Sequence, residues 1–109
     1  MSQLNTRATI DTLRTQDSST LTGSYQAFGS IVTHQMRLIK ITNDSNKLVF
    51  ISIDGINDNE VLPASSFLLI DFAANRETGN AWELPANTQF YVKGTAGTGF
   101  IYLSVYYAN

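Results

Sequence analysis

Apolar and polar residues alternate with a period of two along most of this chain, and no window sustains the 3.6-residue period of an α-helix. In residues 48–53, for example, Val49, Ile51 and Ile53 point to one side of an extended backbone, and the residues between them point to the other. The pattern therefore predicts strands, and the stretch 48–72 is the centre around which the rest of the chain is organised.

A second apolar run, residues 66–72, completes this central stretch. Its four consecutive apolar positions, 67–70, followed by Phe72 after Asp71, are typical of a strand that is covered on both faces or lies at the centre of a sandwich. The connector between the two runs contains Asp54-Gly55 and Leu62-Pro63, and both pairs are turn signals. We expect Gly55 to close its turn at a positive φ, which only glycine adopts at low cost.

The last apolar run, residues 100–107, predicts a strand whose two faces are both apolar or aromatic. One face carries Ile101, Leu103, Val105 and Tyr107, and the other carries Phe100, Tyr102, Ser104 and Tyr106. A strand with an apolar outer face is often covered by another subunit.

Turn signals recur about every ten residues along the chain, as in small all-β domains. Further strands are expected at residues 8–13, where threonines favour a strand over a weak helix, at 21–28 with a break at Gly23, and at 36–43. A strand at 89–93 is expected to carry Phe90 and Val92 on one face, and a polar hairpin loop is expected at 43–46. About seven or eight short strands predict one antiparallel β-sandwich, jelly-roll or immunoglobulin-like, over residues 1–109. Residues 1–12 are expected to form an extended or flexible N-terminal arm.

The amino-acid composition and net charge indicate which classes of molecule this protein could bind. Only 15% of the residues are charged, against about 25% in an average soluble domain, which suits a protein sheltered in an assembly or working outside the cell. The net charge is −2 and Lys and Arg do not cluster, so we expect no nucleic-acid binding.

No apolar stretch reaches the roughly 20 residues of a membrane span, and we expect neither a membrane anchor nor a signal peptide. The absence of cysteine excludes disulfides and thiolate chemistry.

Three segments resemble chemical sites. Asp54, Asp58 and Glu60 could supply oxygen ligands for calcium, but their spacing differs from an EF-hand and favours a turn closed by Asx side chains. The glycine-rich segment 94–99 lacks the GK[ST] of a phosphate loop and favours a hairpin turn. His34 has no second histidine or cysteine as a partner and is expected in a loop or at a sheet edge. We therefore expect no catalytic, cofactor-binding or metal-binding residues.

The aromatic residues leave two interpretations open. They could stack on sugars, or they could form the core and a subunit interface, and their places on predicted strands favour the second. The candidate interface residues are Trp82, Tyr91, Phe100, Tyr102 and Tyr106.

Three segments together resemble small structural proteins of tailed bacteriophages, from about Leu13 to the end of the chain. These segments read YQAFG, LIKITNDSNKLVFISIDGINDNEVLPASSFLLIDFAANR and WELPANTQFYVKGTAGTGFIYLSVYYA. The resemblance implies a β-sandwich virion component without enzymatic activity, such as a capsid decoration (cement) protein, a head-fibre base, or a collar or tail piece. It marks no catalytic residue, and its recurrent residues look like turn and strand-end positions: Asp54, Gly55, Pro63, Asp71, Asn75, Arg76 and Gly94.

From this resemblance we expect a virion protein that contacts other phage structural proteins, namely the major capsid, portal, collar or tail proteins. We also expect a homo-oligomer, with a trimer suited to the threefold positions of a capsid. The competing function is a carbohydrate- or receptor-binding module of a phage tail, with Trp82 as its stacking platform.

Overall fold

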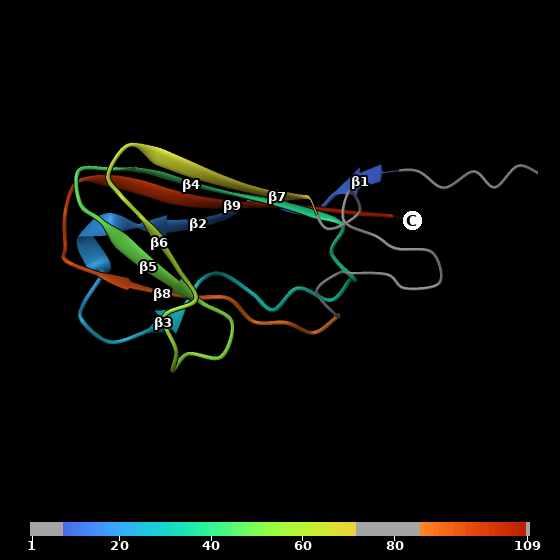
Figure 1. Cartoon of the computed structure of the whole chain (residues 1–109), viewed down its shortest axis with the longest axis horizontal. Coiled ribbons are helices and arrows are strands. Elements are labelled where there is room, and N and C mark those ends of the chain that lie inside the picture. The colour runs from blue at the N-terminus through green and yellow to red at the C-terminus, as the bar shows by residue number, and fades with distance from the viewer. Residues whose placement is uncertain (1–7, 72–85, 109) are drawn as a thin grey trace, which may run out of the picture.

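The computed structural model describes residues 8–71 and 86–108, which form two antiparallel sheets packed face to face (Figure 1). The described residues contain nine strands, rather than the seven or eight expected. The five-stranded sheet consists of β1 (Ala8–Ile10), β2 (Arg14–Asp17), β4 (Leu38–Ser45), β7 (Ser66–Asp71) and β9 (Gly99–Ala108). The four-stranded sheet consists of β3 (Gln26–Ala27), β5 (Val49–Ser52), β6 (Glu60–Leu62) and β8 (Tyr91–Gly94).

The strand order is that of a jelly roll. Strands β1 and β2 both pair with β9, one after the other, and together behave as a single interrupted strand. Each strand of the first half of the chain then pairs with its counterpart in the second half: β1 and β2 with β9, β3 with β8, β4 with β7, and β5 with β6. A long hairpin folded over in this way is the double-sheet jelly-roll arrangement. The expected antiparallel β-sandwich is confirmed.

The hydrophobic core lies between the two sheets, and β9 contributes its centre. Ile101, Leu103 and Val105 are completely buried, as the alternation along this strand predicts. The predicted pairing of Phe90 with Val92 on one face is also confirmed, since both are buried. The other core residues come from both sheets and from the segments before and after β3: Leu21, Phe28, Val32, Met36, Ile39, Ile41, Val49, Ile51 and Leu62.

One charged side chain, Arg14, points into the sandwich from β2 and is only 7% exposed. Its Nε donates to the carbonyl of Ser30 at 2.8 Å, and its two terminal nitrogens donate to the carbonyls of Thr12 (3.1 Å) and Ile31 (3.2 Å). One of these nitrogens also pairs with Asp11 at 3.3 Å. A buried guanidinium is tolerated because its donors are satisfied in this way. Arg14 therefore holds the loop after β3 against the edge of the five-stranded sheet.

A second buried polar residue, Asn43, joins the ends of three strands. Its Nδ2 donates to the carbonyls of Leu62 (3.0 Å) and Lys47 (2.9 Å), and its Oδ1 accepts from the Ser45 hydroxyl at 2.6 Å. Because Leu62 ends β6 and Lys47 precedes β5, this amide fixes where the chain crosses between the sheets. The expected hairpin loop at 43–46 is therefore wrong: residues 43–45 belong to β4, Asn43 is drawn inward by its hydrogen bonds, and the next strand, β5, lies in the other sheet and does not pair with β4.

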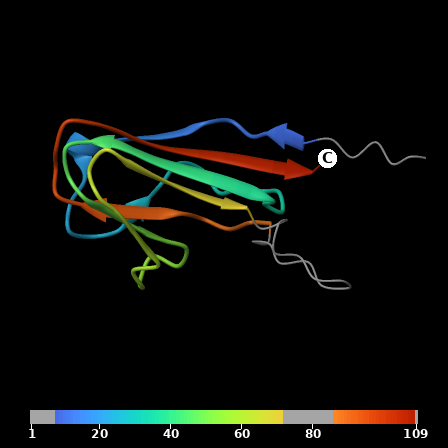
Figure 2. The ribbon, with the colours of Figure 1, turned by 45° about the horizontal axis from the view of Figure 1, so that its top comes forward.

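The expectation that residues 66–72 form a strand covered on both faces is wrong. β7 lies at the edge of the five-stranded sheet, beside β4, and its residues alternate between half-buried and exposed (Figure 2). Phe67 is 65% exposed and Leu69 is 53% exposed. An apolar run without alternation does not say whether its second face is covered by this chain or by another one.

Several shorter strands also differ from the expectation. The segment 21–28 contributes only β3, because most of it crosses between the sheets, while β2 and β6 were not expected at all. Within the expected N-terminal arm, residues 8–10 are extended and pair with β9 as β1. Strands of only three or four residues are too short for the alternation of apolar and polar residues to be recognised in the sequence.

Replacing Arg14 with Ala should lower the free energy of unfolding by about 1.5–3 kcal/mol, because it removes charge-assisted hydrogen bonds from buried carbonyls. The matched control is Lys47→Ala, at an exposed position, where a change within about 0.5 kcal/mol is expected. Urea denaturation of both variants measures the difference. Equal stability of the two variants would contradict this role of Arg14.

Candidate functional site

The outer face of the five-stranded sheet, away from the core, is apolar and aromatic over three neighbouring strands. Its members alternate with the core residues along each strand. They are Leu38, Lys40, Thr42 and Asp44 of β4, Phe67, Leu69 and Asp71 of β7, and Phe100, Tyr102, Ser104 and Tyr106 of β9. We call this set the outer face.

The strand register arranges the outer face in rows that run across the sheet. Thr42 pairs with Tyr102 on one side and with Phe67 on the other. Lys40 lies in the next row, opposite Leu69, and its ammonium is 5.5 Å from the centre of the Phe67 ring. Phe100 stacks on Tyr102 with ring centroids 6.2 Å apart. A shallow hollow of about 240 Å³ opens among Thr42, Ser66, Phe67 and Tyr102.

Three of the five predicted interface residues come together on this surface. Phe100, Tyr102 and Tyr106 all lie on the outer face, with Phe100 42% exposed and the two tyrosines half-buried. Tyr91 does not join them, because it belongs to β8 of the other sheet. Trp82 lies outside the described residues. Sequence reasoning missed Phe67 and Leu69, whose exposure depends on β7 being an edge strand.

The four-stranded sheet presents a different outer surface, in which charges are paired. Asp58 accepts hydrogen bonds from the Tyr25 hydroxyl and from the Lys93 ammonium, the latter at 3.1 Å. The Lys93 ammonium also lies 4.6 Å from the Tyr25 ring and 5.5 Å from the Phe50 ring. The hydrogen bond from Tyr25, and then the one from Lys93, lowers the pKa of Asp58. Burial, followed by the bond to Asp58, raises the pKa of the Tyr25 hydroxyl.

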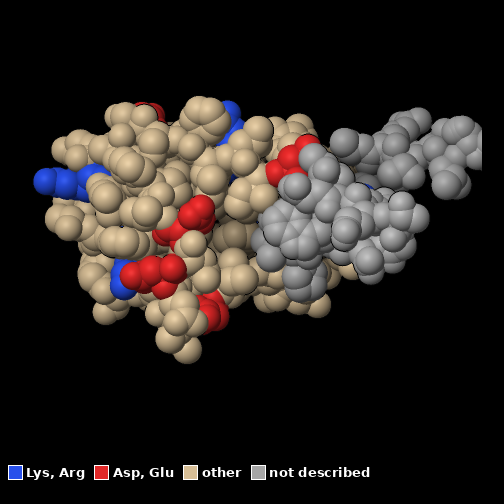
Figure 3. All heavy atoms as spheres, in the orientation of Figure 1, with Lys and Arg blue, Asp and Glu red and all other residues tan. Residues whose placement is uncertain are grey.

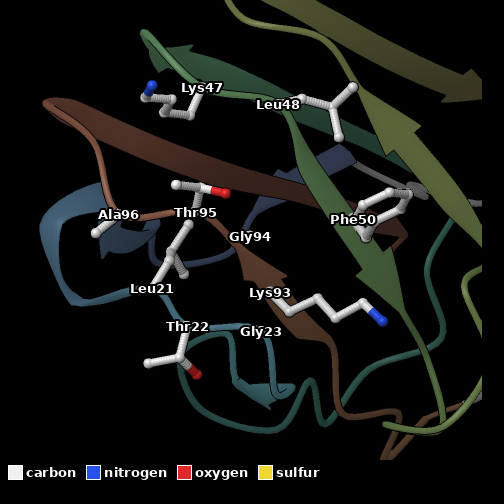
Figure 4. Close-up of a pocket in the computed structure, with 10 residues that line it drawn as sticks. All are labelled: Leu21, Thr22, Gly23, Lys47, Leu48, Phe50, Lys93, Gly94, Thr95 and Ala96. Atoms are coloured by element: carbon white, nitrogen blue, oxygen red, sulfur yellow. The ribbon is translucent and has the colours of Figure 1, made fainter.

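An open groove of about 640 Å³ lies beside this cluster (Figure 4). Lys47 and Leu48 line one side of it and Leu21 and Thr22 the other, while Phe50 and Lys93 come from the adjacent strands β5 and β8. Apolar side chains and two ammonium groups together could hold a small polar ligand with apolar parts.

Figure 3 shows one side of the molecule, on which uncharged residues predominate and charged side chains are scattered.

The turn after β5 uses the carboxylate of Asp54 for its own closure. Oδ1 of Asp54 accepts from the backbone N–H groups of Ile56 and Asn57, both at 2.9 Å, and from the Ser52 hydroxyl at 2.7 Å. The two backbone bonds are the main reason why the pKa of Asp54 lies well below its usual range. Gly55 has a φ of +76°, so the predicted positive φ is confirmed.

These carboxylates do not converge on a common point. Asp54 is bound to its own turn and Asp58 to Tyr25 and Lys93, and the part of the chain that the structure describes contains no cluster of three metal-ligating side chains. The glycine-rich segment connects β8 to β9, which belong to different sheets, so the expected hairpin turn is wrong and the segment is a crossover between the sheets. His34 lies exposed in the segment before β4 and stacks on Tyr107, with ring centroids 3.8 Å apart.

No protein-family model, no curated protein and no solved structure matches this chain. The described residues also contain no helix long and apolar enough to cross a membrane.

Replacing Gly55 with Val should cost about 1–3 kcal/mol of stability through backbone strain. Space adds to the effect, because a Cβ at this position would lie 3.4 Å from the Tyr91 ring. Gly23→Val is the matched control, since a Cβ at Gly23 would meet nothing within 4 Å and no positive φ is involved. Thermal melts that show both variants equally stable would contradict this account of the turn.

Proposed function

We propose that this protein is a non-catalytic structural subunit of a tailed-phage virion, held in the particle by the outer face of its five-stranded sheet. The positions that fit best are a capsid decoration (cement) protein or a head-fibre or collar protein, in contact with phage structural proteins and with its own copies. The observation that carries the proposal is the exposure of Phe67 and Leu69 beside Tyr102 and Tyr106 on one sheet face.

The physical argument is the cost of leaving such a face in water. Apolar area removed from water contributes about 25 cal/mol per Å², and a stable protein contact buries about 800 Å² per partner. Interface centres are rich in aromatic residues, and this face carries Phe67, Phe100, Tyr102 and Tyr106, with the single cation Lys40 in its middle row. The low charged fraction of the whole chain, 15%, agrees with a subunit that is sheltered by its neighbours.

The fold supports the same proposal by analogy alone. Jelly rolls occur in viral capsid proteins and in lectins, so the fold leaves both the structural and the sugar-binding function open. The outer face supports the structural function, because flat apolar sheet faces suit protein contacts better than sugar contacts. Its charged residues Lys40, Asp44 and Asp71 lie in different rows, and Asp17 of β2 borders it opposite Phe100.

A carbohydrate- or receptor-binding module of a phage tail is the second candidate. The groove beside Phe50 favours it, because an aromatic ring lies there next to the side chains of Lys93 and Thr22. This function would leave the outer face of the other sheet without a role.

The structural proposal predicts that Tyr102→Lys prevents incorporation of the protein into particles, because it places an unpaired ammonium at the centre of the contact. Ile56→Lys is the matched control: Ile56 is 79% exposed in the turn after β5, and this variant should be incorporated normally. Mass spectrometry of purified virions measures both. If the unmodified protein is missing from the virions, the structural proposal is wrong.

The second candidate predicts that the protein binds to a glycan array and that Phe50→Ala abolishes this binding while the protein remains folded. Tyr102→Lys should leave such binding intact, since Tyr102 lies on the other sheet. Glycan binding lost through Phe50→Ala, combined with normal incorporation of Tyr102→Lys, would replace the first proposal by the second.

A further inference from the structure

We infer that the free edge of β7 pairs antiparallel with β7 of a second copy of this chain, so that the two five-stranded sheets become one continuous sheet across a two-fold axis. This inference deepens the proposed function by naming a partner and a contact. It rests on the backbone edge of β7, and the outer face of β9 is not needed for it.

The four sheet edges of the sandwich differ in how they are protected. β3 has two residues and β6 has three, including Glu60. The edge opposite β7 is interrupted between β1 and β2, and β2 carries Arg14 and Asp17. Short edge strands, charges and interruptions are the usual means by which proteins prevent edge-to-edge association.

β7 has none of these protections. It is a continuous six-residue strand, SFLLID, with no proline and with Asp71 at its very end as the only charge. It pairs with β4 along its whole length, and no described strand pairs with its other edge. Because hydrogen-bonding direction alternates along an antiparallel strand, about half of its N–H and C=O groups point toward that free edge. Another extended strand could bind there by sheet extension.

The sequence of β7 is complementary to itself when the two-fold axis lies at Leu68. In an antiparallel pair, two directly opposed residues place their side chains on the same face of the sheet. The two-fold axis must therefore bring one residue of β7 opposite the same residue of the second copy. With the axis at Leu68, Phe67 lies opposite Leu69 of the second copy, and Leu68 lies opposite its own equivalent. The half-buried Ser66 and Ile70 then oppose each other on the inner face. Every opposed pair lies on the correct face, and no charge is brought opposite a like charge.

This register also continues the rows of the outer face from one copy into the next. Lys40 and Leu69 share a row in one copy, and Thr42 and Phe67 share a row in the other. The two rows join where Leu69 meets Phe67 of the second copy. Phe67 and Leu69 of both copies, four apolar side chains in all, therefore pack against one another around the axis. The contact is isologous and gives a dimer. The trimer expected from the sequence would instead need a heterologous contact through another surface.

Disulfide trapping tests the register directly, because the chain has no cysteine of its own. Two single-cysteine variants, Phe67→Cys and Leu69→Cys, are mixed in equal amounts under mild oxidation. One of them carries a mass tag, so that the mixed disulfide can be told from the dimer of either variant alone. The mixture should form the mixed disulfide at least about tenfold faster than either variant forms a dimer alone. Opposed Cβ atoms lie within disulfide reach, whereas diagonal neighbours are about 7–8 Å apart. Val61→Cys, 48% exposed on the edge strand β6, sets the rate of random collision.

Sedimentation velocity of the unmodified chain gives the second measurement. A concentration-dependent dimer is expected, and Leu69→Glu should abolish it while remaining folded, because Lys40 can pair with the new carboxylate within one copy. Val61→Glu should still dimerise. A mixed disulfide that forms no faster than the Val61→Cys dimer, or association that is unaffected by Leu69→Glu, would overturn the inference.

The two proposals can fail separately. Tyr102→Lys lies two strands from the β7 edge and should leave the trapping rate unchanged. If trapping fails but incorporation into particles still depends on Tyr102, β7 pairing is wrong and the structural function stands. If trapping succeeds but the protein is absent from virions, the pairing stands and the structural function is wrong.

Discussion

The pairing of β4 with β9 is the interaction on which the rest of this structure depends. The two strands are in register over eight residue pairs, from Leu38 opposite Tyr106 to Ser45 opposite Gly99. Because side chains alternate between faces, this register fixes the core and the outer face at the same time. A slip by one residue would move Ile101 and Leu103 to the solvent and the tyrosines of β9 into the core. Close backbone approach at Gly99, where a Cβ would lie 2.1 Å from the carbonyl oxygen of Asp44, helps to hold this register.

This constraint explains why the two outer surfaces of the sandwich differ. On the four-stranded sheet, polar groups satisfy each other within the chain, as Tyr25, Asp58 and Lys93 do. On the five-stranded sheet, the residues alternating with the core are Tyr102, Leu69 and Phe67, which have nothing comparable to satisfy them. We interpret the first surface as complete in the single chain and the second as completed by neighbours. The lone edge strand without protection, β7, borders this second surface.

The sequence predicted the features that depend on local periodicity or on one special residue. The faces of β9, the buried Phe90 and Val92 and the positive φ of Gly55 are of this kind, because each is determined within a few residues. Exposure of β7 could not be predicted in the same way. An apolar strand looks alike whether its second face is covered by its own chain or by another copy, so the placement of Phe67 required the tertiary structure.

Long-range polar contacts were also beyond the sequence. Arg14 reads as an ordinary surface cation, and only the loop after β3, 16 residues away, provides the carbonyl of Ser30 that makes its burial possible. Asn43 was expected in a loop because asparagine is common in turns. It lies inside because Leu62, 19 residues later, supplies an acceptor for its amide. The cluster of Tyr25 with Asp58 and Lys93 likewise joins three separate segments.

The central claim is that the outer face of the five-stranded sheet is covered by protein in the assembled particle. Cryo-electron microscopy of the intact virion tests it most directly, by locating this chain in the map and identifying what lies against Phe67, Leu69 and Tyr102. The account predicts density from a neighbouring subunit over these residues, with the groove beside Phe50 open to solvent. A map in which the outer face is exposed, or in which the chain is absent, would contradict it.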